Sequence, residues 1–253
     1  MQIKKIIFIF IFIFSSFALA KFDHQHLIWG EVLLKNTNRK DLQVNVQYEK
    51  LQKNDKQFKS YLNELEELDA SEFKNFSSLE QLAFWINAYN AYTIKLVLQN
   101  YPIKSIKDIS SGFFSHLLSR GPWDIKFIKL MGQKLSLNQI EHEIIRKNFN
   151  EPRIHFAVNC ASISCPSLMQ EPFTADKLDA QLDIAASVFL NDKTKNFTKN
   201  NILYLSKIFD WYGSDFKQKH GDFQKYIISN LQLPQIKYQV EFLEYNWGLN
   251  DDK

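Results

Sequence analysis

Both cysteines of the chain lie in one short stretch, RIHFAVNCASISCPSL, at residues 153–168. Four residues, three of them small, separate Cys160 from Cys165, and His155 precedes them in RIHFAV, a segment that predicts a strand. On an extended strand His155 points away from the face that carries the isoleucine and phenylalanine on either side of it. Residue types and spacing allow three chemical interpretations: a disulfide, a thiol nucleophile with its base, or a metal site.

A disulfide between Cys160 and Cys165 is favoured by the even cysteine count and by the oxidising compartment that the N-terminal sequence predicts. Four intervening residues can bring the two Cα atoms within the roughly 7 Å that a disulfide spans. A loop this short gains only roughly 2 kcal/mol from chain entropy, so the bond would fix a turn and not the whole domain.

A thiol nucleophile requires a thiolate, a base and a group that orients the base. His155 is the candidate base for Cys160. Cys165 stands directly before a proline, which favours the first position of a helix, where a thiol pKa is lowered. The candidates to orient the imidazole are Asn87 and Asp210, although nothing in the sequence places either beside His155.

A metal site would draw on His155, Cys160, Cys165 and His142. The cysteines lack the two-residue spacing of structural zinc sites, and the histidines lack an i, i+4 pair. We therefore expect no metal ligands and no cofactor.

The stretch SSLEQLAFWINAYNAYTIKLVLQNYP predicts the central helix of the fold. Ser77 and Glu80 have the spacing of a capping box, and the segment from 79 to 98 is apolar on nearly every side. Asn87 and Asn90 are exceptions on one face, and a buried amide without a partner costs about 1–3 kcal/mol. Hydrogen bonds to the backbone of a neighbouring loop are favoured over a functional role, because most side-chain hydrogen bonds go to backbone or water.

A second helix begins after Ser136, which caps it with Gln139. Its core face is formed by leucine 137 and isoleucines 140, 144 and 145. Glu141 and His142 lie off that face, and Arg146 shares the face of His142. Glu141 and His142 are therefore further candidates for a site.

The remaining elements predict an α+β fold, with a single domain in which amphipathic helices surround a central buried helix and a small, mainly antiparallel sheet. Residues 55–68 and ADKLDAQLDIAASVFL predict amphipathic helices, Met131 and Gly132 form the turn of a hairpin, and ILYLS and YQVEFLEYNW predict strands. Helices interrupted by isolated hairpins, without regular alternation, argue against a parallel βαβ fold.

The N-terminus predicts export. Lys4 and Lys5 precede an unbroken apolar run at 6–14, and Ala18-Leu19-Ala20 supplies the small residues that a signal peptidase reads. The run is too short to span a bilayer. We expect residues 1–20 to be a cleaved secretory signal peptide, residues 21–253 to form one globular domain without a transmembrane segment, and the mature protein to be periplasmic or secreted.

Charge offers little guide to partners. Without residues 1–20, which contain two lysines and no acid, the formal charge falls from +3 to +1, with both signs spread along the chain. This balance gives no electrostatic case for nucleic acid or an anionic membrane. His24 and His26, near the start of the mature chain, are expected to be solvated.

Four motifs occur in an order that resembles the domain-of-unknown-function family 547, DUF547: LAFWINAYNAYTIKLVL, LSLNQIEHEIIRKNF, PRIHFAVNCASISCPSL with FTADKLDAQL, and LSKIFDWYGSDF. The resemblance covers about residues 48–247. It implies that the motif positions are Asn87, Asn90, Glu141, His142, His155, Cys160, Cys165, Asp210, Trp211 and Tyr212. It implies no activity, because the family has none assigned.

Two functional hypotheses follow. The first is an exported binding or interaction module in which Cys160 and Cys165 form a disulfide and the Asn and His residues form a buried hydrogen-bond network. The second is a thiol-dependent hydrolase or acyl transferase of papain-like or transglutaminase-like chemistry, in which Cys160 attacks a carbonyl carbon and His155 is the base. Neither hypothesis predicts a substrate, a partner or an oligomeric state.

Overall fold

The computed structural model describes residues 21–109 and 121–252, so the predicted signal peptide lies outside the described residues. The helices are α1 (Leu27–Asn36), α2 (Tyr48–Lys53), α3 (Lys56–Glu67), α4 (Ala70–Phe73), α5 (Ser78–Leu98), α6 (Arg146–Asn148), α7 (Leu178–Asn191), α8 (Ile208–His220) and α9 (Phe223–Asn230). A π-helix, η3 (Gln139–Ile145), leads into α6. Short 3-10 helices are η1 (Ile106–Asp108), η2 (Pro122–Asp124) and η4 (Pro152–Phe156).

Short strands form small sheets between these helices. The pairs β1 (Thr37–Lys40) with β2 (Gln43–Val46), and β3 (Ile128–Leu130) with β4 (Gln133–Leu135), are antiparallel hairpins. In the third sheet β5 (Phe197–Lys199) pairs antiparallel with β6 (Ile202–Leu205), and β6 pairs parallel with β7 (Gln239–Phe242). The α+β fold is therefore confirmed, with the strands divided among small sheets.

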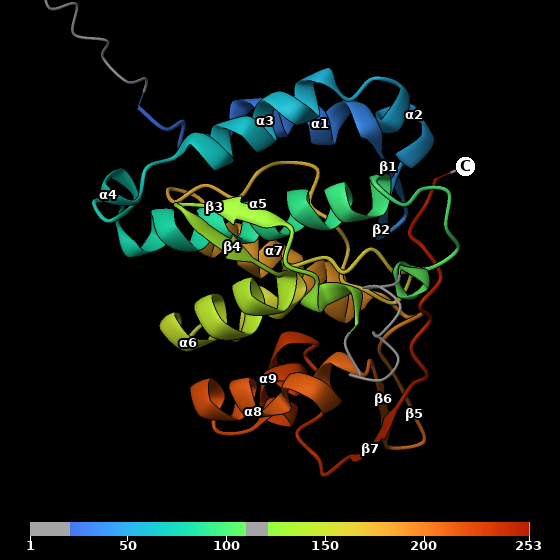
Figure 1. The fold of residues 1–253 in the computed structure, drawn as a ribbon. Coiled ribbons are helices and arrows are strands. Elements are labelled where there is room, and N and C mark those ends of the chain that lie inside the picture. Colours follow the sequence, from blue (N-terminus) through green and yellow to red (C-terminus); the bar gives the residue numbers. More distant parts are fainter. Residues whose placement is uncertain (1–20, 110–120, 253) are drawn as a thin grey trace, which may run out of the picture.

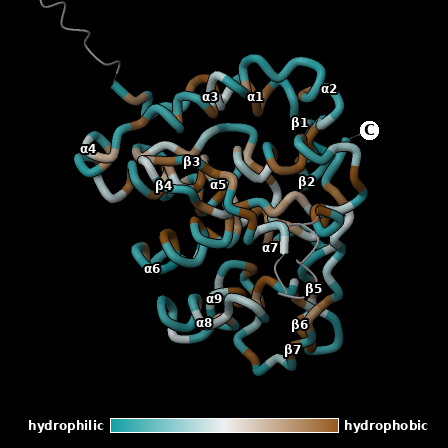
Figure 2. Tube along the Cα trace, viewed as in Figure 1, coloured by the Kyte–Doolittle hydropathy of each residue, from teal (hydrophilic) through white to brown (hydrophobic). Residues whose placement is uncertain are grey.

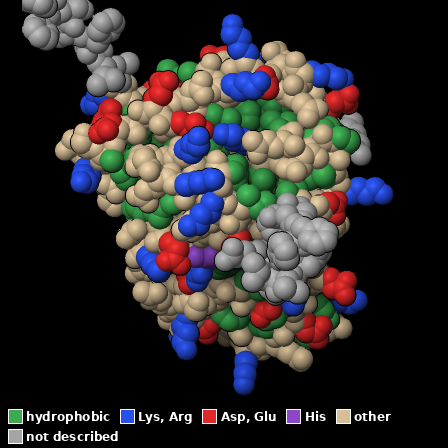
Figure 3. All heavy atoms as spheres, in the orientation of Figure 1, with side chains coloured by type: hydrophobic (Ala, Val, Ile, Leu, Met, Phe, Trp, Pro, Cys, Tyr) green, Lys and Arg blue, Asp and Glu red, His purple; other side chains and the backbone are tan. Residues whose placement is uncertain are grey.

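Helix α5 forms the centre of the molecule, with α1 to α3 on one side and α8, α9 and the third sheet on the other (Figure 1). Ser77 and Glu80 form the predicted capping box. Hydrophobic segments concentrate around α5 and α7, while the outer elements are largely hydrophilic (Figure 2). Positive and negative side chains are both distributed over the face shown in Figure 3.

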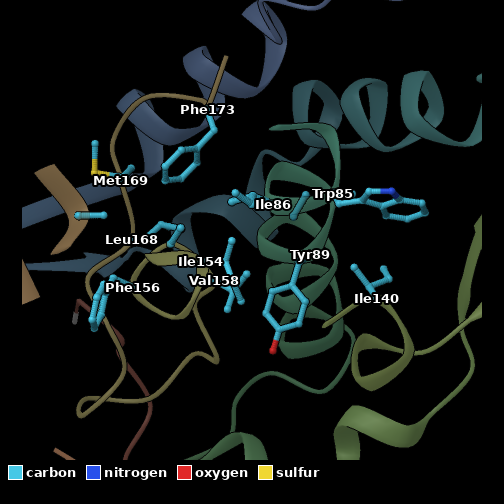
Figure 4. Close-up of a cluster of buried hydrophobic side chains, with 14 of the residues drawn as sticks. Trp85, Ile86, Tyr89, Ile140, Ile154, Phe156, Val158, Leu168, Met169 and Phe173 are labelled. Atoms are coloured by element: carbon cyan, nitrogen blue, oxygen red, sulfur yellow. The ribbon is translucent and has the colours of Figure 1, made fainter. Parts of the chain in front are cut away.

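The core around α5 joins segments that are far apart in sequence (Figure 4). Ile154, Leu168 and Phe173 lie on one side of α5, and Ile140 lies on the other. All four are at most 2% exposed. The two motif segments that carry the candidate site residues therefore pack against the same helix.

The predicted strand at residues 153–158 is wrong. Pro152 opens a 3-10 helix, η4, and the Glu151 side chain accepts a hydrogen bond from the Arg153 backbone N–H. The segment packs against both α7 and α8. Ile154, His155 and Phe156 are all buried, so the segment has no solvent-exposed face. Its hydrophobic pattern therefore cannot distinguish a helix from a strand.

The expected exposure of two other residues is also corrected. Glu141 is buried, 6% exposed, because it stands four residues after Leu137 and four before Ile145, a spacing that places it on the same helix face as these two buried residues. His26 is also buried, with its Nδ1 2.8 Å from the Tyr61 hydroxyl.

Candidate functional site

The loop that carries both cysteines, residues 160–165, is anchored to α5 through buried asparagines. Asn90 Nδ2 donates to the Ala157 carbonyl at 3.0 Å, and Asn90 Oδ1 accepts from the Asn159 backbone N–H at 2.8 Å. The Asn159 side chain in turn accepts from the Ala161 N–H at 2.9 Å and donates to the Pro166 carbonyl at 2.7 Å. These hydrogen bonds hold the inner side of the cysteine loop. The prediction that the buried asparagine amide of α5 pairs with the backbone of a neighbouring loop is therefore confirmed for Asn90.

The C-terminal segment holds the outside of the same loop. The Ile163 N–H donates to the Gly248 carbonyl at 2.8 Å, and the Asn250 N–H donates to the Ala161 carbonyl at 3.2 Å. Ala161 has φ of 61°, a left-handed conformation that alanine rarely adopts. Such backbone strain persists only where surrounding contacts enforce it, so the loop is held in a defined shape.

Cys160 is a partly exposed residue, and its thiol lies among hydroxyl groups that can donate hydrogen bonds to it. Its Sγ lies 3.2 Å from the Ser162 hydroxyl and 3.2 Å from the Tyr245 hydroxyl. Burial of the thiol itself opposes ionisation, but hydrogen bonds from Cys165, Ser162 and Tyr245 outweigh this effect and lower the pKa of Cys160. The geometry therefore favours a thiolate at this position.

Cys165 has the opposite character. It is buried, only 2% exposed, and its Sγ accepts the Cys160 backbone N–H at 2.7 Å. Burial first, and then the hydrogen bond and charge of Cys160, raise the pKa of Cys165. Both thiols are free in the described structure.

An aromatic cluster adjoins Cys160. The Tyr245 ring packs against Trp247 and Trp211, with ring centroids 4.5 Å and 4.9 Å apart, and Trp247 contacts Trp123 at 5.5 Å. Trp211 is 42% exposed. The donor that contacts the thiol therefore belongs to a partly exposed apolar surface.

His155 lies in a separate polar cluster with Asp215 and Arg146. Its Nε2 is 2.8 Å from Asp215 Oδ2, and Arg146 donates to both oxygens of the same carboxylate at 2.7 Å. The Tyr212 ring stacks on the imidazole with a centroid separation of 3.8 Å. The imidazole is thereby fixed on one edge and one face.

Electrostatics make His155 neutral. Burial lowers the pKa of His155 and outweighs the attraction of Asp215. Although its own burial acts the other way, hydrogen bonds from His155 and Arg146 hold the pKa of Asp215 well below its usual range. Nε2 therefore carries the proton and donates to the carboxylate, while Nδ1 is a buried acceptor without a hydrogen-bond partner among the described residues.

The π-helix connects this cluster with Cys160. His142 Nδ1 lies 3.1 Å from Arg146 Nη1, and Glu141 is buried beside Tyr212. The pKa of Tyr212 is raised well above its usual value by burial, then by Glu141, and also by the charge of Cys160. Tyr212 therefore stacks on His155 and also interacts electrostatically with Cys160. π-helices frequently occur at functional sites, which supports a role for this segment.

The structure brings some predicted site residues together and separates others. Asn87 pairs with the Phe173 backbone, its Nδ2 donating at 2.7 Å and its Oδ1 accepting at 3.0 Å. Asp210 is exposed and lies 3.5 Å from Lys207. Neither orients His155; Asp215 does.

Among the hydrogen bonds between described residues, none joins His155 to Cys160. The sequence interpretation also missed Asp215 and Tyr245. Asp215 could have been found from its helical spacing, because it follows Tyr212 by three residues on α8 and therefore shares its face. No local pattern relates Tyr245 to Cys160.

Residues 21–109 and 121–252 contain neither a cluster of metal-binding side chains nor a helix that could cross a membrane. No three His, Cys, Asp or Glu side chains there are grouped closely enough to hold a metal ion. The helices of these ranges include none with both the length and the apolar character that a membrane crossing requires.

Comparison with known proteins identifies a family but no activity. The family model described as "Protein of unknown function, DUF547" matches residues 73–190, which include α5, the π-helix and the cysteine loop. Asp215 and Tyr245 lie beyond the match. No curated protein and no solved structure matches the chain. Through residues 73–190, the chain is therefore similar to the DUF547 family.

Proposed function

We propose that this protein is a thiol-dependent acyl transferase or hydrolase whose nucleophile is Cys160. The observation that carries the proposal is that the hydroxyls of Ser162 and Tyr245 each lie 3.2 Å from the sulfur of Cys160, a partly exposed residue. The thiolate is the nucleophilic form of cysteine, and hydrogen-bond donors around the sulfur stabilise it.

In the proposed reaction the Cys160 thiolate attacks the carbonyl carbon of an ester or thioester. A carbon–sulfur bond forms, and the bond to the leaving oxygen or sulfur breaks, which leaves an acyl group on Cys160. Water or an acceptor alcohol or amine then attacks the carbonyl carbon of this thioester and gives up a proton to solvent, the carbon–sulfur bond breaks, and Cys160 leaves as the thiolate. Esters and thioesters are favoured over amides, because an amine leaving group needs a strong proton donor and the His155 Nε2–H is engaged by Asp215.

His155 enters this proposal as a positioning residue. Its imidazole stacks on the Tyr212 ring, and Tyr212 is close enough to Cys160 for the two groups to interact electrostatically. The pair with Asp215 fixes the imidazole and therefore the tyrosine ring. The aromatic cluster of Trp123, Trp211, Tyr245 and Trp247 offers an apolar surface for the acyl group beside the thiol.

We also propose that the protein is exported, with residues 1–20 as a cleaved signal peptide and a periplasmic or secreted mature chain. The basic start, the apolar run and the Ala-Leu-Ala site support this proposal. Expression of the full chain in a bacterium, followed by fractionation and intact mass measurement, tests it. A periplasmic species beginning at Lys21 is expected, and an uncleaved cytoplasmic species would contradict it.

A second candidate function is the exported binding module with a Cys160–Cys165 disulfide. The observation that favours it is the proximity of the two cysteines, with Cys165 Sγ 2.7 Å from the Cys160 N. In this case the bond would be stable and Cys160 would not serve as a nucleophile. Thiol counting on protein purified without reductant separates the two, because a stable bond leaves neither thiol open to alkylation.

The enzyme proposal is tested with reduced protein and a panel of activated aryl esters and acyl thioesters. We expect an acyl adduct on Cys160 by mass spectrometry and turnover that falls at least about 100-fold in Cys160→Ser. Ser187→Ala, at an exposed position on α7, controls for handling and folding. Turnover that survives in Cys160→Ser, or no adduct and no turnover in folded reduced protein, would rule out Cys160 as the acyl-accepting nucleophile.

A further inference from the structure

The two cysteines of the loop differ in access to solvent. Cys160 is partly exposed beside the aromatic cluster, whereas Cys165 is buried and 2% exposed. A reagent that enters from solvent therefore meets Cys160 first. Cys165 is reachable mainly from within the loop.

The two thiols are also close enough to bond. Cys165 Sγ lies 2.7 Å from the Cys160 N, and one N–Cα bond places it no more than about 4 Å from the Cys160 Cα. A disulfide needs Cα atoms roughly 4.4–6.8 Å apart, and the side chain of Cys165 adds only about 3 Å to this path. Bond formation therefore needs side-chain rotation and little movement of the backbone.

We propose that Cys160 and Cys165 form a reversible dithiol–disulfide pair that exchanges with disulfide-bearing substrates, with Cys160 as the attacking thiol and Cys165 as the resolving thiol. This activity rests on the Cys160 thiolate of the proposed function and goes beyond it, because the substrate is a disulfide and the product is an oxidised loop. Nothing else is required for the reaction, since the substrate disulfide is the oxidant.

The reaction has two steps. In the first, the Cys160 thiolate attacks one sulfur of the substrate disulfide, a mixed disulfide forms, and the other substrate sulfur leaves as a thiolate. In the second, Cys165 attacks Cys160 Sγ, the internal disulfide forms, and the remaining substrate sulfur leaves with the Cys165 proton. The substrate disulfide gains two electrons and becomes two thiols, and the cysteine pair loses these two electrons.

The electrostatics of the pair place these steps in order. Burial is the main reason that the pKa of Cys165 is raised, and the hydrogen bond and negative charge of Cys160 raise it further. Forming the mixed disulfide removes that charge. Cys165 then ionises more readily, so the resolving thiol becomes reactive after the attacking thiol has been used.

The loop around the pair is suited to cycling between both states. Asn159, on its inner side, and the segment at 246–250, on its outer side, hold its backbone through hydrogen bonds that do not involve either sulfur. These contacts are independent of the oxidation state. The two states therefore share one backbone frame, and little conformational work opposes the exchange.

Incubation of reduced protein with glutathione disulfide, followed by acid quench, alkylation and mass spectrometry, tests the proposal. We expect the wild-type chain to release two equivalents of glutathione and to finish with an internal disulfide and no adduct. Cys165→Ser should release one equivalent and retain glutathione on Cys160. Cys160→Ser should react at least about 100-fold more slowly, because its remaining thiol is buried, and burial is the main cause that raises the pKa of Cys165.

The outcomes separate this proposal from the acyl-transfer proposal. If the wild-type chain stops at one equivalent with glutathione on Cys160, the resolving role of Cys165 is wrong, while Cys160 remains a reactive thiol. If neither the wild-type chain nor Cys165→Ser reacts, both proposals lose their nucleophile. Exchange without acyl transfer overturns only the latter. Cys165→Ala repeats the test should serine in the buried position impair folding.

Discussion

Asn90→Ala tests how much the buried asparagine hydrogen bonds contribute to stability, because it removes them without disturbing helix α5. The side chain is 2% exposed and satisfies two backbone groups, the Ala157 carbonyl and the Asn159 N–H. Alanine keeps the helix intact, because it has the highest helix propensity. The substitution removes both hydrogen bonds and leaves the two backbone groups buried.

The structure allows the magnitude to be worked out. Each buried backbone group left without a partner costs about 1–3 kcal/mol, and the neighbouring loop relaxes to recover part of this. We therefore expect Asn90→Ala to lower the free energy of unfolding by about 2–4 kcal/mol. For a domain of this size, in which 1 kcal/mol shifts the melting temperature by about 2–4 °C, the melting temperature should fall by roughly 4–16 °C.

The assay is urea unfolding followed by circular dichroism, together with the rate of Cys160 alkylation in the native state. Asn87→Ala should cost a similar free energy, because Asn87 also satisfies two backbone groups, but it should leave the alkylation rate unchanged, since its partner is Phe173. Asn100→Ala, at an exposed position just beyond the helix, should change stability by less than about 0.5 kcal/mol. Equal stability of Asn90→Ala and Asn100→Ala would refute the reasoning.

Further predictions concern titration, the thiol donors and the polar cluster. Burial lowers the pKa of His26 to about 4, below its value in the unfolded chain. The contribution of neutral His26 to stability is therefore complete above pH 6.5, and about 3 kcal/mol of it is lost as the pH falls toward 4. Urea unfolding of the wild type and of His26→Gln across this pH range checks the prediction, and identical pH profiles would contradict it. Tyr245→Phe removes a donor 3.2 Å from Cys160 Sγ and should slow alkylation at neutral pH about ten-fold, as measured by mass-detected labelling; an unchanged rate would show that this hydroxyl does not stabilise the thiolate. Asp215→Asn removes the carboxylate that pairs with His155 and should destabilise the fold by roughly 1–3 kcal/mol in urea unfolding, less than a fully buried pair because Asp215 is partly exposed; unchanged stability would contradict the role of this pair.

Regular elements with strong local signals were predictable from sequence. The capping box of Ser77 and Glu80, the hairpin turn at Met131 and Gly132, and the stripe of α3 all occur as predicted, because each depends on residues a few positions apart. The buried asparagines also met backbone partners, as the cost of an unpaired amide requires.

The parts of the site that failed depend on packing from distant segments. Residues 153–158 alternate like a strand, yet α7 and α8 cover them on more than one side, so burial carries no period. The burial of Glu141 is an exception, because its spacing of four residues from both Leu137 and Ile145 already places it on the core face of the helix. His26 is buried by Tyr61 from another helix.

The cysteine loop has a consequence for how the protein acquires reactivity. Tyr245 lies 85 residues beyond Cys160, and Asn90 lies 69 residues before Asn159. Contacts between such distant residues form only when the chain pays the entropy of closing a large loop. Until they close, Cys160 is an ordinary cysteine without its phenol donor. The rate at which Cys160 reacts is therefore a direct signal of completed folding, and misfolded copies in a mixture should be recognised by their slow, unperturbed thiols.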